Sequence, residues 1–107
     1  MKYIQYQLVI VNLDPTVGSE IKKTRPCVII SPNEMNANLN TIVIAPITSN
    51  QRDYPTRVKV QFNSRESRIV VDQIRTIDKQ RIVKKIGQLS PSEKETLKNV
   101  IYETYVQ

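Results

Sequence analysis

The sequence contains no histidine and no tryptophan, and it has only one cysteine and no long hydrophobic run. Histidine is the side chain that titrates near neutrality without perturbation. Its absence excludes proton transfer by a histidine pair and zinc ligation by histidine. The single cysteine, Cys27, cannot form an internal disulfide, and no cluster of potential metal ligands surrounds it. Its apolar neighbours indicate a small buried residue rather than a reactive thiol.

The lack of a long apolar stretch also argues against a transmembrane helix. Residues 1–7 have neither the hydrophobic segment nor the cleavage site of a secretory signal peptide. We therefore expect a cytoplasmic protein with no membrane partner. The length of 107 residues, 39% of them hydrophobic, predicts a single domain spanning residues 1–107 with one modest core.

Positive charge is in excess. Sixteen Lys and Arg residues stand against ten Asp and Glu, which gives a net charge of +6 and a pI near 9.6. A basic excess on so small a protein favours polyanionic partners. The densest basic region is 75–85, for which a solvated sheet edge kept soluble by charge is an equally good interpretation.

Short apolar segments rich in branched residues predict a protein built mainly of strands. These segments are 7–13, 26–30, 41–47, 56–62, 68–71, 73–77 and 82–86. Strict alternation in 56–62 predicts one dry face and one wet, basic face. Pro46 is expected to end its strand or to mark a sheet edge. Residues 33–40 are expected to form a polar connection.

The last segment predicts a helix. Ser90-Pro91-Ser92-Glu93 combines a capping box with proline at the first helical position. Leu97, Val100, Ile101 and Tyr105 then recur at helical spacing on one apolar face. Many short strands followed by one helix favour a small barrel or curled sheet, a mainly β fold with appended helices, over a layered α/β fold.

Three blocks of sequence are distinctive: VNLDPTVGSEIKKTRP at 11–26, APITS at 45–49 and VDQIRTIDKQR at 71–81. Together, and in this order, they resemble the MazF/PemK/Kid family of toxins. The resemblance implies a small SH3-like (CcdB/MazF-like) barrel that works as a homodimer. It also implies a metal-independent endoribonuclease without cofactors that cuts single-stranded RNA to 2′,3′-cyclic phosphate and 5′-hydroxyl ends. A cognate acidic, MazE-like antitoxin would inhibit it, and the toxin–antitoxin complex would bind DNA.

The chain departs from the family pattern at three points. Relatives usually open the first strand with Gly-Asp, where this chain has Tyr6-Gln7. The Kid branch has an arginine two residues before the Asp-Gln pair, where this chain has Val70, and it uses a histidine that this chain lacks. The resemblance therefore favours the MazF-like pair of Arg25 and Thr48 as catalytic residues.

Chemistry supports a role for Arg25, because its fork of donors fits two phosphate oxygens and its charge persists at any working pH. An arginine keeps its proton and is therefore a poor base. We expect Arg25 to stabilise the negative charge of the phosphate and, beyond that, only to donate a proton. Thr48 is expected to bind a phosphate oxygen or orient the 2′-hydroxyl. Glu20 is the third catalytic candidate, as the base or as a reader of a nucleobase edge, and a solvated loop carboxylate is the alternative.

Further residues are expected to bind RNA. They are Ser19, Lys22, Lys23, Ser49, Asp72 and Gln73. Gln73 offers a donor and an acceptor to a splayed base. Asp72 could support the site, but its simplest role is that of a structural partner of a nearby arginine. Tyr54 and Phe62 are candidates for base stacking, with core or hairpin packing as the alternative.

Two other functions compete with RNA cleavage. A CcdB-like toxin on the same fold would poison DNA gyrase, but that activity depends on a tryptophan near the end of the last helix, which this chain lacks. A non-catalytic basic barrel that binds nucleic acid accounts for the charge but assigns no purpose to Arg25 and Thr48. Footprinting without strand scission would favour it.

Overall fold

The computed structural model describes residues 2–13, 24–50 and 52–106, and the expected loop 14–20 lies outside them. The strands are β1 Gln7–Asn12, β2 Thr24–Ile29, β3 Thr41–Thr48, β4 Arg57–Phe62, β5 Arg65–Val70, β6 Arg75–Asp78 and β7 Ile82–Gln88. The helices are α1 Asn33–Asn38 and α2 Pro91–Tyr105, with short 3-10 turns η1 Val71–Gln73 and η2 Lys79–Arg81. The predicted mainly β fold is confirmed.

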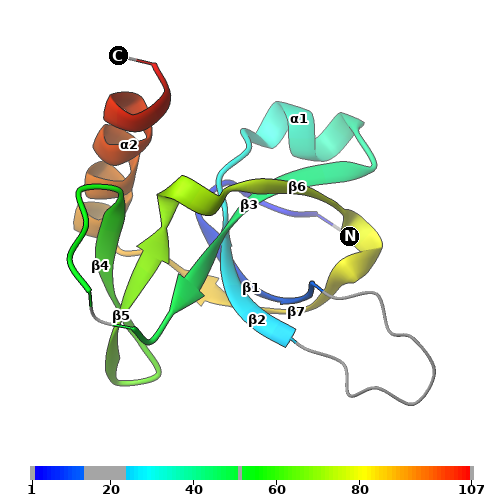
Figure 1. Ribbon diagram of the computed structural model, residues 1–107. Coiled ribbons are helices and arrows are strands. Elements are labelled where there is room, and N and C mark those ends of the chain that lie inside the picture. The colour runs from blue at the N-terminus through cyan, green and yellow to red at the C-terminus, as the bar shows by residue number, and fades with distance from the viewer. Residues whose placement is uncertain (1, 14–23, 51, 107) are drawn as a thin grey trace.

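The strands form one curled antiparallel sheet in the order β4-β5-β3-β2-β1-β7, with β6 paired to β3 off this path. Figure 1 shows β1, β2, β3, β6 and β7 wrapped into a half-barrel, while β4 and β5 turn away beside α2. The helix α2 contacts β4, and α1 lies against β3 near the other end of the molecule. The curl follows from the twist that antiparallel strands accumulate.

Strand β3 is the centre of the sheet, which contradicts the expectation for Pro46. β3 continues to Thr48 and pairs with β2, with β6 through residues 41–44, and with β5 at residues 47–48. Pro46 lies between the stretch paired with β6 and the stretch paired with β5. Its missing N–H therefore falls where the ladder on that side is interrupted, so a proline is tolerated within a central strand.

Both faces of the central strands are buried. Alternate residues of β1 and β2 enter different clusters: Leu8 and Val28 belong to one, Val9 and Cys27 to the other. The first cluster is covered by β4, β5 and α2 through Leu97, and the second lies within the curl. Burial on both sides explains why these strands read as continuous apolar runs rather than as alternating ones. The prediction that Cys27 is buried is confirmed.

Residues 33–40 are not a simple polar connection, because 33–38 form the helix α1. Its anchor is Asn36, which is 2% exposed and donates from Nδ2 to the carbonyl of Ser31 at 2.9 Å. The Ser31 hydroxyl contacts Asn36 Oδ1 and accepts from the Val43 N–H at 3.1 Å. These polar contacts stabilise a helix too short and too polar to show apolar periodicity.

The predicted start of α2 is confirmed. Ser90 is the N-cap, its Oγ accepts from the Glu93 N–H at 3.2 Å, and Glu93 Oε1 accepts from the Ser90 N–H at 2.9 Å. The second carboxylate oxygen of Glu93 accepts from the Gln61 N–H at 3.1 Å, which ties the first turn of α2 to β4. Tyr105 then donates its hydroxyl to the Val71 carbonyl at 2.7 Å.

The departure at Tyr6 has a structural explanation. Tyr6 has a φ of 70°, in the left-handed region that favours glycine, the residue that relatives usually have there. Its N–H donates to the Ile29 carbonyl at 2.6 Å, and its carbonyl accepts from the Leu89 N–H at 3.2 Å. The half-buried ring packs against the first core cluster. Packing of this ring offsets the cost of a backbone conformation that a side chain disfavours.

Candidate active site

Strands β2 and β3 bring the two predicted catalytic residues together. Their antiparallel register pairs Cys27 with Pro46, and continuing it by two residues places Arg25 opposite Thr48. Residues directly opposite each other project from the same face of a sheet. The strand begins at Thr24 rather than at Pro26 as expected, because Thr24 and Arg25 still pair with Asn12 and Val11 of β1.

Two cavities meet at this pair. The larger has a volume of about 670 Å³ and is lined by Thr24, Arg25, Pro26, Ile47, Thr48, Ser49, Phe62, Asn63, Arg65 and Ser67. The smaller has a volume of about 190 Å³ and is lined by Arg25, Pro46, Thr48, Asn50, Arg57, Val70 and Gln73. Arg25 and Thr48 line both. Among the described lining residues there are three arginines and no carboxylate, so both cavities suit an anion.

One wall of the larger cavity is the β4–β5 hairpin. Its two turn residues, Asn63 and Ser64, have φ values of 51° and 61°, the conformation of a tight two-residue hairpin turn. Phe62 precedes the turn, lines the cavity and also packs against the core. The packing interpretation of Phe62 is confirmed, and its role in base stacking stays a prediction.

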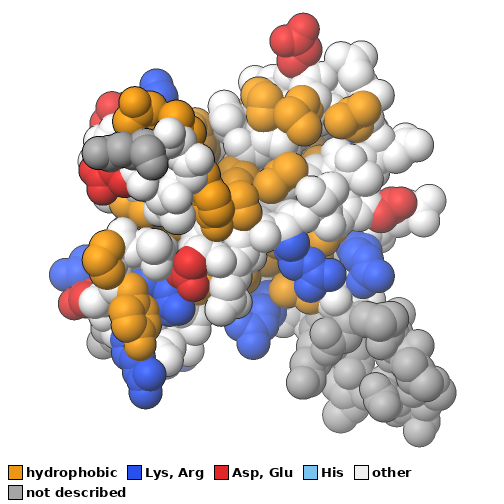
Figure 2. All heavy atoms as spheres, turned by 45° about the horizontal axis from the view of Figure 1, so that its top comes forward, with side chains coloured by type: hydrophobic (Ala, Val, Ile, Leu, Met, Phe, Trp, Pro, Cys, Tyr) orange, Lys and Arg blue, Asp and Glu red, His pale blue; other side chains and the backbone are white. Residues whose placement is uncertain are grey.

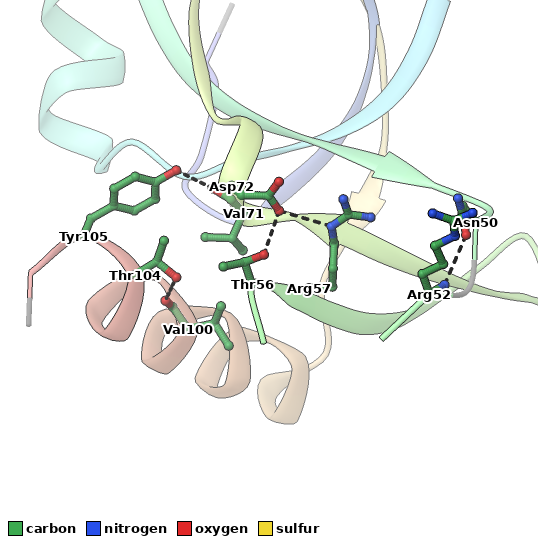
Figure 3. A network of polar contacts seen from close by, with 9 residues as sticks. All are labelled: Asn50, Arg52, Thr56, Arg57, Val71, Asp72, Val100, Thr104 and Tyr105. Atoms are coloured by element: carbon green, nitrogen blue, oxygen red, sulfur yellow. Dashed lines mark hydrogen bonds and ion pairs between the residues drawn. The ribbon is translucent and has the colours of Figure 1, made fainter. Parts of the chain in front are cut away.

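The loop after β3 is held by its own side chains. Thr48 Oγ1 accepts from the Asn50 N–H at 3.1 Å, and Asn50 Oδ1 accepts from the Arg52 N–H at 3.1 Å. Figure 3 shows the second of these contacts. Because the Thr48 oxygen acts as the acceptor, its hydroxyl proton remains available as a donor to an incoming group.

A second polar group borders the smaller cavity. Asp72 Oδ1 accepts from the Thr56 hydroxyl at 2.8 Å and from Arg57 Nε at 3.1 Å (Figure 3). Burial raises the pKa of the Asp72 carboxyl, but the hydrogen bonds from Thr56, Arg57 and the Asp72 backbone, together with the positive charge of Arg57, lower it more, so the pKa lies below its ordinary value. The Tyr54 ring lies over the Arg57 guanidinium, with its centroid 5.0 Å from Cζ.

Arg68 on β5 is directly opposite Thr48, but it is not available to a substrate. Its side chain is 3% exposed and contacts Asp53 at 2.9 Å and Glu66 at 3.0 Å. Asp53 belongs to the loop that follows β3. The buried guanidinium therefore fixes that loop to β5.

Cys27 lies two residues from Arg25 but takes no part in the site. Burial raises the pKa of its thiol to about 12, against the lowering effect of Arg25 and Arg75. The thiol therefore stays protonated at any physiological pH, as expected for a buried structural cysteine. In the described part of the chain, no three His, Cys, Asp or Glu side chains are grouped to hold a metal ion.

The structure thus brings together five of the nine predicted site residues. Arg25, Thr48, Ser49 and Gln73 line the cavities, and Asp72 lies beside them bound to Arg57. The other four, Ser19, Glu20, Lys22 and Lys23, lie outside the described residues. Sequence reasoning did not single out Arg57 or Asn50. The wet, basic face predicted for 56–62 includes Arg57 and was the signal from which it could have been found.

Fold and site together define a class: a small curled β-sheet protein with a cationic, mixed polar and apolar site at one end of the sheet. In Figure 2, most of the visible Lys and Arg side chains lie on the lower half of the face shown. No helix in the described ranges is long and apolar enough to cross a membrane.

Comparison with known proteins places the chain within this class. The family model for the PemK-like, MazF-like toxin of type II toxin–antitoxin systems matches residues 4–105. The chain is 34% identical over 96 residues to the endoribonuclease MazF of Staphylococcus saprophyticus, covering 84% of this chain and 80% of that protein. This chain therefore belongs to the PemK-like, MazF-like toxin family.

Solved structures show the same fold. The Mycobacterium tuberculosis toxin MazF-mt6 matches with a TM-score of 0.77 and 27% identity, covering 91% of this chain and 93% of that one. A mycobacterial endoribonuclease in complex with its cognate antitoxin matches with a TM-score of 0.80 and 20% identity, covering 94% and 92%. The predicted small barrel of MazF type is confirmed.

Proposed function

We propose that the protein is the toxin of a type II toxin–antitoxin system and a metal-independent endoribonuclease that cuts single-stranded RNA. The observation that carries this proposal is the pairing of Arg25 and Thr48 at the junction of two cationic cavities. The identity to a MazF endoribonuclease over most of both chains supports the same activity.

In the proposed reaction, the 2′-oxygen of a ribose attacks the adjacent phosphorus, the new O–P bond forms and the bond to the 5′-oxygen breaks. The products are a 2′,3′-cyclic phosphate and a 5′-hydroxyl. Arg25 donates to the phosphate oxygens as negative charge builds on them. Thr48, on the facing strand, donates its hydroxyl to a phosphate oxygen or orients the 2′-hydroxyl.

The base and the acid are the remaining requirements. The base takes the proton of the 2′-hydroxyl, and an acid supplies a proton to the departing 5′-oxygen. Because no described lining residue is a carboxylate, Glu20 remains our candidate for the base. Ser49 and Gln73 line the cavities as proposed RNA contacts, and Ser19, Lys22 and Lys23 are proposed to bind phosphate or sugar.

We further propose that the toxin works as a homodimer and that a cognate acidic, MazE-like antitoxin neutralises it by covering the cationic cavities. The net charge of +6 supports an acidic partner. The complex of a similar endoribonuclease with its cognate antitoxin supports an antitoxin as that partner. DNA binding by the complex belongs to this proposal.

The test is incubation of the purified protein with a long RNA transcript in the presence of EDTA, followed by mapping of the new 5′ ends. We expect cleavage at a short recurring sequence with 5′-hydroxyl ends. Arg25→Ala should lose about 10²-fold or more in rate while remaining folded, because it removes a donor to the transition state.

Lys98→Ala is the matched control, since it removes one positive charge from an exposed position on α2. Its cleavage rate should equal that of the wild-type protein. Full activity of Arg25→Ala would remove Arg25 from the mechanism, and cleavage that EDTA abolishes would refute metal independence.

A further inference from the structure

We propose that Arg57 is a second catalytic arginine, which donates to the scissile phosphate across the smaller cavity from Arg25, and that Asp72 and Tyr54 are its positioning residues. This inference rests on the proposed nuclease function and adds to it a residue that neither the sequence motifs nor the family resemblance pointed to.

The first observation is the position of Arg57. It lies on β4 directly opposite Val70 of β5, and both residues line the cavity that Arg25 and Thr48 also line. The cavity volume of about 190 Å³ accommodates a phosphate group rather than a nucleobase with its sugar. Two guanidinium groups therefore line one small space whose other described lining residues carry no charge.

The second observation is the way in which Arg57 is held. Only Nε contacts Asp72, at 3.1 Å. A purely structural arginine–carboxylate pair commonly uses two parallel hydrogen bonds from the fork. Here the terminal nitrogens have no hydrogen-bond partner among the described residues, and Figure 3 shows them pointing away from Asp72. The side chain is nevertheless only 14% exposed.

The third observation is that the guanidinium is held in a fixed orientation. The Tyr54 ring covers one of its faces, with the centroid 5.0 Å from Cζ. The backbone N–H of Arg57 donates to the Tyr54 carbonyl at 3.0 Å, which fixes the Tyr54 backbone beside β4. Asp72 is fixed in turn by the Thr56 hydroxyl at 2.8 Å. A donor oriented before the substrate arrives is what electrostatic stabilisation of a transition state requires.

The chemistry gives such a donor a clear task. Attack of the 2′-oxygen concentrates negative charge on the two non-bridging phosphate oxygens, and one guanidinium can face only one side of the phosphate. Arg25 and Arg57 come from different strands and can donate to the phosphate from two sides. Because these contacts strengthen as negative charge builds on the phosphate oxygens, the effect of Arg57 appears in the rate of the chemical step more than in RNA binding.

The experiment uses an RNA oligonucleotide that carries a cleavage site mapped with the wild-type protein. Single-turnover cleavage rates are measured at saturating protein for wild type, Arg57→Gln, Arg57→Lys and Asp72→Asn. Affinity is measured with the same oligonucleotide containing a 2′-deoxyribose at the cleaved position, which cannot react. Lys59→Gln is the matched control, because it removes a positive charge from the same face of the same strand.

We expect Arg57→Gln to slow cleavage about 10²-fold, with less than about a tenfold loss of affinity for the 2′-deoxy oligonucleotide. Arg57→Lys should also be slow, because a single ammonium group cannot contact Asp72 and the phosphate as the fork does. Asp72→Asn should be slower than wild type, and Arg57→Gln/Asp72→Asn should be no slower than Arg57→Gln alone.

Cleavage by Arg57→Gln or Arg57→Lys at the wild-type rate overturns the inference. So does an equal loss in Lys59→Gln, which would indicate a general effect of charge. If the melting temperature of Arg57→Gln is well below that of the wild type, the cleavage rate of Arg57→Lys is the test: a slow rate supports the inference and a wild-type rate overturns it. These outcomes differ from failure of the proposed function, in which the wild-type protein itself cleaves no RNA and Arg25→Ala changes nothing.

Discussion

At the scale of single residues, three of the arginines in or near the cavities, Arg25, Arg57 and Arg68, differ in how they are held. Arg25 is exposed and free to meet a phosphate, and Arg57 is anchored through one nitrogen. Arg68 is enclosed between Asp53 and Glu66 and supports the loop that follows Thr48. The number of donors that the protein occupies therefore separates the proposed substrate contact, Arg25, and the proposed oriented donor, Arg57, from the structural tie, Arg68.

The lowered pKa of Asp72 makes a prediction about acid stability. Its carboxylate stabilises the folded state fully above the ordinary aspartate pKa of about 3.9, and that contribution is lost as the pH falls through the lower folded value. The free energy of unfolding should therefore fall more steeply with acidification in the wild type than in Asp72→Asn. Urea unfolding at a series of pH values measures this difference.

Thr56→Val provides the intermediate case, because it keeps the carboxylate and removes one of its two side-chain donors. Its acid sensitivity should lie between those of the other two proteins. Identical profiles for all three would contradict the assigned hydrogen bonds.

Sequence reasoning identified the residues that a linear motif contains, and it was weaker for those that meet only in space. Arg25 and Thr48 stand 23 positions apart, yet each lies in a recognisable block, so their proximity was predicted. Arg57 lies in no such block. Its contact with Asp72 depends on the β4–β5 pairing, which residue spacing alone does not give. The role of Glu20 stays a prediction.

At the scale of elements, Glu93 joins α2 to the sheet. Its carboxylate accepts from the Ser90 N–H as part of the cap and from the Gln61 N–H on β4. Ser90→Ala should cost about 1 kcal/mol of unfolding free energy as the loss of a cap. Glu93→Ala should cost more, about 2 kcal/mol, because a cap and a link between elements are lost together.

Urea unfolding of the two variants tests the difference, with Glu103→Ala as a control at an exposed position of the same helix. The control should unfold as the wild type does. Equal losses in Ser90→Ala and Glu93→Ala would show that the contact with Gln61 contributes nothing.

Elements with strong local signals were predicted well, and those fixed by tertiary contacts were not. The capping box and apolar spacing located α2, because both signals are local. Helix α1 was missed, since its stability comes from the contacts of Asn36 with Ser31 rather than from an apolar face. The role of Pro46 was misjudged because a proline cannot donate a hydrogen bond to a neighbouring strand and so is expected at a strand end or a sheet edge. Here β3 changes partner at that residue, so no such hydrogen bond is needed.

At the scale of the whole molecule, the positive charge predicts a strong dependence of RNA binding on salt. The logarithm of affinity for the 2′-deoxy oligonucleotide should fall linearly with the logarithm of salt concentration, by about 0.7 for each phosphate neutralised. Arg25→Ala should reduce the slope by about one such contact. Fluorescence anisotropy across a salt series measures both slopes, and an unchanged slope would place Arg25 away from phosphate.

The central place of β3 has a consequence for how the protein loses activity. This one strand carries Thr48, borders both cavities and holds the β4–β5 arm to the half-barrel. Separating its pairings would divide the sheet and both hydrophobic clusters at the same moment. The proposed catalytic residues cannot separate while the rest of the sheet stays intact, so on heating the protein should keep its full cleavage activity up to its melting temperature.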